Sequence, residues 1–171
     1  HEGGGLKELT LTTNGSQLRR FAQPLADCGV KRVNVSLDTL NEKKFAAITR
    51  RNQFAQVMDG IDAAQEAGLA VKLNAVALKG INDDEILELT QYAVDNALDI
   101  YFIEEMPLGE ISSHQRQDTK LESVTIRELL ETKFRLGDSD FSDPASGPSR
   151  YLQIAESDTK VGFISPMSNN F

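Results

Sequence analysis

The feature that most constrains this fold is a regular alternation of strand-like and helix-like segments between residues 9 and 106. The intervals between successive strands are long enough for helical crossovers, which join parallel strands. The pattern therefore predicts an α/β fold with parallel strands, arranged either as a doubly wound sheet or as part of a barrel. The expected strands are 9–13, 32–37, 71–76 and 100–105, and the expected helices are 16–28, 42–48, 54–67 and 83–96.

The first expected helix contains an apolar stripe and a proline. Leu18, Phe21, Leu25 and Cys28 share one helical face, which predicts that Cys28 packs against the core rather than binding a metal. Pro24 is expected to interrupt the helix, because proline has no backbone N–H to donate.

Capping-box signals mark two later helices. Asn82 and Glu85 have the spacing of a capping box, and Thr125 and Glu128 repeat it. The two pairs predict the starts of the helices over 83–96 and 125–134. Beyond Pro107 the sequence predicts, in order, a polar loop, a helix over 125–134, a loop over 137–149 and a hairpin with strands at 151–155 and 161–164.

The first three strands each combine one apolar face with one polar face. A parallel strand between two helical layers is usually apolar on both faces, so the pattern favours a barrel whose polar faces line the lumen. The polar positions also cluster toward the carboxyl ends of the strands, where (β/α) barrels have their active sites. We therefore expect a cavity for a polar ligand. The residues on these polar faces are Thr12, Asn14, Ser36, Asp38, Lys72 and Asn74.

Each of these residues also has a purely structural interpretation. Thr12 can be an ordinary strand former, and Ser36 can end a strand ahead of a helix cap provided by Asp38. Lys72 lies in mid-strand between apolar neighbours and needs an anionic partner or a shifted pKa. That partner can be an internal carboxylate, Asp38 or Glu104, instead of a ligand.

Composition narrows the classes of function. The net charge of −8 argues against a nucleic-acid partner. One cysteine and two histidines cannot form a disulfide framework, and they are too few to hold a zinc ion or an iron–sulfur cluster. No apolar run approaches the roughly 20 residues of a membrane span, and no signal peptide is evident, so we expect a cytoplasmic protein without a membrane partner. The chain starts with His and ends in an apolar stretch, which suggests a piece of a longer protein.

Five sequence segments, taken in their order along the chain, carry a family resemblance. They are LTTNG, RVNVSLDTLNEKKFAAIT, VKLNAVALKGIND, FIEEMPLG and GFISPMSNNF. Together they resemble the GTP 3′,8-cyclase family (molybdenum cofactor biosynthesis protein A), whose members are radical S-adenosylmethionine (SAM) lyases. RVNVSLDTL is the most specific of them, whereas TTNG occurs in many radical SAM proteins. The resemblance implies about four βα units of an incomplete six-unit radical SAM (β/α) barrel over 1–109. A C-terminal lateral segment with a helix and a hairpin would follow over 110–171.

The resemblance also implies roles for particular residues. Thr12 and Lys72 would contact GTP, and Ser36 and Met106 would contact SAM. The family uses SAM and two 4Fe-4S clusters to cyclise GTP in the first step of molybdopterin synthesis, and a cyclic pyranopterin synthase acts on the product. The cluster cysteines would lie before and after this chain in the parent protein, so no catalytic residue and no metal ligand is expected within it.

Two further expectations follow. The chain alone should be inactive, and the sheet edge at 9–13 should promote homodimers or aggregation. Two other interpretations stay open: a radical SAM enzyme with another substrate, and a non-catalytic nucleotide-binding barrel module.

Overall fold

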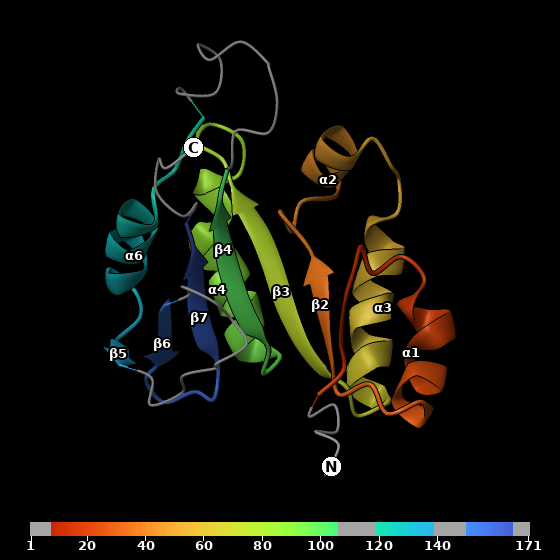
Figure 1. Ribbon diagram of the computed structural model, residues 1–171. Helices are drawn as coiled ribbons and strands as arrows, with labels where there is room; N and C mark the ends of the chain where they lie inside the picture. The colour runs from red at the N-terminus through yellow and green to blue at the C-terminus, as the bar shows by residue number, and fades with distance from the viewer. Residues whose placement is uncertain (1–7, 106–118, 139–149, 166–171) are drawn as a thin grey trace, which may run out of the picture.

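The computed structural model describes residues 8–105, 119–138 and 150–165. Its elements follow the alternation predicted from the sequence (Figure 1). In chain order they are β1 (Thr10–Thr13), α1 (Leu18–Asp27), β2 (Arg32–Ser36), α2 (Glu42–Thr49), α3 (Phe54–Glu66), β3 (Ala70–Ala77), the 3-10 helix η1 (Asp83–Glu85), α4 (Ile86–Asp95), β4 (Asp99–Glu104), α6 (Ser123–Glu131), β5 (Leu136–Asp138), β6 (Arg150–Ile154) and β7 (Lys160–Ile164).

The strands form a seven-stranded sheet in the order β1-β2-β3-β4-β7-β6-β5. Strands β1 to β4 are parallel, as predicted, and β7 pairs parallel to β4. The predicted C-terminal hairpin is β6–β7, and β5 adds a further antiparallel strand. The hairpin therefore extends the same sheet. The expected division into residues 1–109 and 110–171 falls outside the described residues and stays a prediction.

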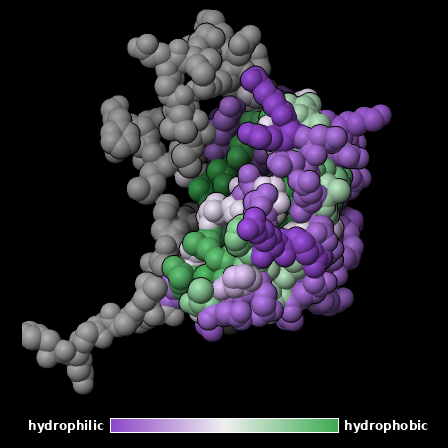
Figure 2. Space-filling model, turned by 90° about the vertical axis from the view of Figure 1, so that its right-hand side faces the viewer, coloured by the Kyte–Doolittle hydropathy of each residue, from purple (hydrophilic) through white to green (hydrophobic). Residues whose placement is uncertain are grey.

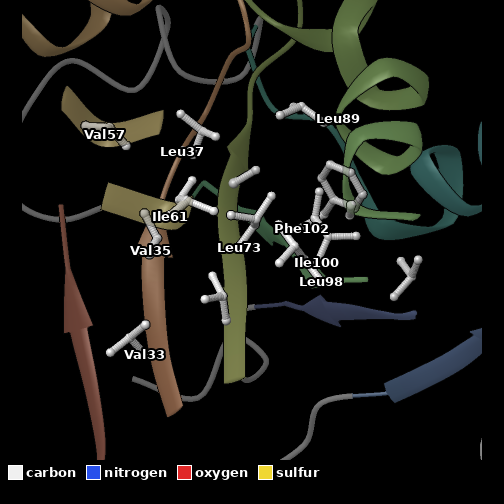
Figure 3. Packing of buried hydrophobic residues seen from close by; sticks show 14 of the residues in the cluster. Val33, Val35, Leu37, Val57, Ile61, Leu73, Leu89, Leu98, Ile100 and Phe102 are labelled. Carbon is white, nitrogen blue, oxygen red and sulfur yellow. The ribbon is translucent and has the colours of Figure 1, made fainter. Parts of the chain in front are cut away.

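The described helices that pack on the sheet, α3, α4 and α6, cover one of its faces (Figure 1). Figure 3 shows how this face is filled: Val35 of β2 lies near Ile61 of α3, and Phe102 of β4 lies beneath Leu89 of α4. All four side chains are fully buried. Helices on one face of parallel strands are the arrangement of a (β/α) barrel, as predicted from the sequence.

A close contact joins α1 to α3. A Cβ atom placed on Gly60 would lie 2.5 Å from the carbonyl oxygen of Gly15 and 3.0 Å from the Cβ of Leu18. On the outer surface Arg19 forms ion pairs with Asp59 and Glu66. Figure 2 shows this side of the molecule, on which hydrophilic side chains predominate. Glycine at position 60 thus allows the two helices to approach closely.

The apolar stripe predicted for α1 is partly wrong. Leu18 and Ala22 are buried, whereas Phe21 is 43% exposed and Cys28 is exposed just after the helix. The inward face follows positions 18, 22 and 25, so residues 21 and 28 turn away from the core. Pro24 does not interrupt the helix. Its side chain is exposed, and the single hydrogen bond that it removes lies where water can replace it.

Both predicted capping boxes are also wrong. Asn82 and Glu85 are buried and bind other segments, as described below. Helix α6 begins at Ser123, two residues before Thr125, and its first N–H is bound by a distant carboxylate. Within the described ranges no helix has the length and apolar character needed to cross a bilayer.

Candidate functional site

The helix-free face of the sheet carries two rows of mostly polar residues. Strand pairing aligns Thr12 with Asn34 and Asn34 with Lys72. The next row, nearer the carboxyl ends, aligns Ser36 with Asn74 and Asn74 with Tyr101. The intervening residues of the strands point toward the helices. We call these two rows the polar face, and its position agrees with the lumen predicted from alternation.

Lys72 is the cation at the centre of the polar face. The residue is 9% exposed, and its Nζ lies 3.7 Å from the centroid of the Tyr101 ring. Tyr101 pairs with Asn74, two residues beyond Lys72, so the lysine side chain extends toward the carboxyl edge of the sheet. That is the edge at which barrel enzymes hold their ligands.

Two buried amide oxygens flank this lysine. The Oδ1 atoms of Asn34 and Asn74 have no hydrogen-bond partner among the described residues. The amide of Asn34 donates to the hydroxyl of Thr12, over a long distance of 3.4 Å. Buried acceptors are costly when unsatisfied. A cation beside two such acceptors, one on the paired strand and one two residues further along β3, therefore suits a ligand that has both anionic groups and N–H or O–H donors.

Beyond the polar face, a buried network ties the segment after β2 to the segment after β3. The Asp38 carboxylate accepts a hydrogen bond of 2.8 Å from the backbone N–H of Val76. The Asn82 side chain donates to the carbonyls of Asp38 and Val76 and accepts from the N–H of Leu78. The pKa of Asp38 is raised, because burial outweighs the lowering effect of the hydrogen bond from Val76. Asp38 thus links the segment after β2 to β3 and to the segment after it. It is not the cap of a helix, because Asn41 caps α2.

Glu85 extends the same network to α2. Its carboxylate accepts hydrogen bonds of 2.8 Å from the Thr39 hydroxyl and the Leu40 N–H, and it lies 2.9 Å from the Nζ of Lys44. Burial raises the pKa of Glu85, but Lys44, Thr39 and Leu40 together outweigh burial and leave the pKa lowered. The network holds the backbone that directly follows Ser36.

Glu104 lies on the opposite, helix-covered face, because it pairs with Ala77. It accepts hydrogen bonds from the Ser123 N–H at 2.9 Å and from the Ser165 hydroxyl at 2.6 Å. Burial raises the pKa of Glu104, but these hydrogen bonds and the charge of Lys120 together outweigh burial, so the pKa is lowered. Glu104 therefore anchors α6 and the end of β7. The interpretation that pairs it with Lys72 is wrong.

The structure brings together three of the four residues implicated by the resemblance. Thr12, Ser36 and Lys72 lie on the polar face, and Met106 lies outside the described residues. Sequence reasoning missed Tyr101, although alternation within β4 could have placed it opposite the helices. It also missed Tyr151, whose ring centroid lies 5.3 Å from that of Tyr101. The described part of the chain contains no group of three His, Cys, Asp or Glu residues arranged for a metal ion.

Five parallel strands, with the described helices on one face and polar residues on the other, define a partial (β/α) barrel whose polar face is the candidate site. The model of the Radical SAM superfamily matches residues 2–93, and that of Molybdenum Cofactor Synthesis C matches residues 98–171. This chain belongs to the radical SAM superfamily. A crystal structure of a radical SAM methyltransferase from Sphaerobacter thermophilus matches 71% of this chain and 36% of that chain, with a TM-score of 0.52 and 19% identity. That match supports the fold alone.

Curated relatives cover nearly the whole chain. The GTP 3′,8-cyclase of Paracoccus denitrificans is 50% identical over 171 residues, that of Rhodobacter capsulatus 54% over 168 residues, and that of Pseudomonas entomophila 54% over 169 residues. The matches cover 98–100% of this chain but 49–51% of those proteins. The chain thus spans about half the length of these relatives. The family resemblance and the partial barrel predicted from the sequence are both confirmed.

Proposed function

We propose that this chain is part of a GTP 3′,8-cyclase, called here the parent protein, and that the polar face binds GTP beside SAM. The observation that carries the proposal is Lys72, a buried cation that extends toward the carboxyl edge, with the buried amide oxygens of Asn34 and Asn74 on neighbouring positions of the polar face. The names of the relatives, which match over the whole chain, supply the substrate.

Each residue has a binding role in this proposal. Lys72 provides a point charge for the GTP phosphates, and the hydroxyl of Thr12 contacts the same nucleotide. Ser36 and Met106 contact SAM, and the network behind Ser36 holds its backbone in place. These residues bind and orient, and none of them has to act as an acid or a base. When bound, SAM supplies the radical chemistry, while the protein positions the reacting atoms and excludes water.

The 4Fe-4S clusters expected in the parent protein do not fit the residues of this chain. The sequence has one cysteine, Cys28, and it lies exposed at the end of α1, away from the polar face. A cluster needs several thiolates, so its ligands must come from outside this chain. A cytoplasmic location, a homodimer and a downstream cyclic pyranopterin synthase are further parts of the proposal.

The test compares GTP with guanosine. Lys72→Met keeps most of the side-chain volume and removes the charge. In the parent protein it should weaken GTP binding about ten- to hundredfold, as expected for the loss of a charge-assisted contact, and weaken guanosine binding little. Lys43→Met, at an exposed position of α2, is the matched control and should leave both affinities unchanged. Isothermal titration calorimetry measures all four.

Two outcomes would contradict the proposal. If Lys72→Met weakens guanosine as much as GTP, Lys72 does not contact the phosphates. If ATP binds as tightly as GTP, the substrate is another nucleotide. Ser36→Ala should show the reverse selectivity of Lys72→Met, with weaker SAM binding and unchanged GTP binding.

A further inference from the structure

We propose that Tyr101 is a positioning residue that fixes the ammonium of Lys72, and that Gly162 of β7 provides the space for its ring. The inference rests on the proposed function, in which Lys72 contacts the GTP phosphates. It links the C-terminal hairpin to the substrate site, because the glycine that sets the position of the ring lies in that hairpin.

The first step is the direction of the lysine side chain. Lys72 pairs with Asp99 in the sheet, yet its Nζ lies over the ring of Tyr101, two residues further along β4. The separation of 3.7 Å from the ring centroid is within the range of a cation–π interaction. Tyr101 is 5% exposed, so the interaction is largely shielded from water. The ring thus holds the ammonium near the carboxyl edge.

The second step is the space under the ring. Gly162 pairs with Tyr101, and a Cβ atom at position 162 would lie 2.9 Å from the Cδ1 and Cε1 atoms of that ring. Any other residue at this position would therefore move the ring. Gly137 of β5 offers a contrast in the same sheet, because a Cβ atom there would meet nothing within 4 Å.

The third step is the support on the far side. Tyr151 of β6 pairs with Gly162, and its ring meets that of Tyr101 at a centroid distance of 5.3 Å and an interplanar angle of 60°. Tilted aromatic pairs at this distance attract each other. The Tyr101 ring is therefore held by β6 and β7 together. The hairpin therefore sets the position of the Lys72 ammonium, although neither of its strands carries a residue assigned to the substrate.

The test first observes the lysine directly. In the parent protein with ¹³C-labelled lysine, the ε-methylene protons of Lys72 should be shifted upfield by the ring current of Tyr101. Lys72→Arg assigns the signal. Tyr101→Phe keeps the ring and should keep the shift, whereas Tyr101→Leu should abolish it. Gly162→Ala should reduce the shift, and Gly137→Ala, the matched control, should leave it unchanged.

The second measurement is nucleotide affinity. Tyr101→Leu should weaken GTP binding roughly five- to thirtyfold, the range expected for a shielded cation–π contact, and affect guanosine little. Tyr101→Phe should bind GTP like the wild type. Gly162→Ala should fall between them. If Tyr101→Leu does not fold, Gly162→Ala against Gly137→Ala decides the question.

The two proposals can fail separately. An unchanged shift and unchanged GTP affinity in Tyr101→Leu would overturn the positioning role, whatever Lys72→Met does. A shift that depends on Tyr101 while Lys72→Met binds GTP normally would leave the contact intact and overturn the phosphate assignment. In that case Tyr101 would still hold the Lys72 ammonium, but it would have no role in positioning GTP.

Discussion

The carboxylate of Glu104 accepts a hydrogen bond from the backbone N–H of Ser123, 2.9 Å away, at the first residue of α6. Glu104 is 7% exposed and Ser123 is half-buried, so removal of the carboxylate leaves this N–H without its partner in a part-buried position. Glu104→Ala should therefore lower the free energy of unfolding by about 1.5–3 kcal/mol. Urea denaturation followed by circular dichroism measures the difference.

Glu122→Ala is the matched control for Glu104. It removes an exposed carboxylate next to the same helix start, and it should change the free energy of unfolding by less than about 0.5 kcal/mol. Equal losses in the two variants would show that the contact with Ser123 is not what stabilises α6.

Acid should destabilise the protein through Glu85 and Glu104. The pKa of each is lowered in the fold, so each contributes stability above its unfolded value of about 4.3. That contribution is lost as the pH falls through the lowered folded pKa. The double variant Glu85→Gln, Glu104→Gln should show a smaller fall in the free energy of unfolding between neutral pH and pH 3. The pKa of Asp38 is raised and acts in the opposite sense, but both proteins keep it.

Asn82 should tolerate no change to aspartate. The residue is fully buried, and its side-chain amide donates to the carbonyls of Asp38 and Val76 at 2.7 and 2.9 Å. Asn82→Asp would replace this donor by a charged acceptor that faces two carbonyl oxygens. We expect a loss of about 3 kcal/mol or more in the free energy of unfolding. Asn52→Asp, at an exposed position, should be almost neutral, and a similar loss there would contradict the explanation.

Gly60→Ala should destabilise the contact between α1 and α3. Alanine is the better helix former by about 1 kcal/mol, so propensity alone predicts a gain. The added Cβ would lie 2.5 Å from a backbone oxygen of Gly15, which cannot move without shifting the start of α1. We expect a net loss of about 1–3 kcal/mol. Gln56→Ala on the exposed face of α3 is the control, and a rise in thermal stability of Gly60→Ala would refute the close approach.

The periodic parts of the fold could be predicted from the sequence. The four parallel strands, their helices and the C-terminal hairpin come from alternation and apolar spacing, which act over a few neighbouring residues. The polar face follows from the same alternation, so Thr12, Ser36 and Lys72 could be placed together. Local patterns cannot show a residue that binds a distant segment. Asn82 and Glu85 have the spacing of a helix cap, but burial turned both side chains toward the segment after β2.

The same limit applies to Tyr101 and Gly162. Their contact depends on β7 lying beside β4, and the two are separated by residues that gave no pairing signal. A lysine between apolar neighbours indicates a partner for its charge, but nothing in the local pattern points to an aromatic ring. The prediction that Cys28 packs against the core was wrong for a simpler reason. A stripe with a spacing of three or four residues drifts around the helix, so its last member lies on the exposed side.

The strict alternation of β3 has an evolutionary consequence. Leu73 and Lys72 are neighbours, one in the core and the other on the polar face. Inserting or deleting a single residue before them would exchange their sides and damage both at once. We therefore expect this strand to vary by substitution rather than by a change in length. The same alternation of side chains thus sets both the core face and the ligand face of β3, so the two are inherited together.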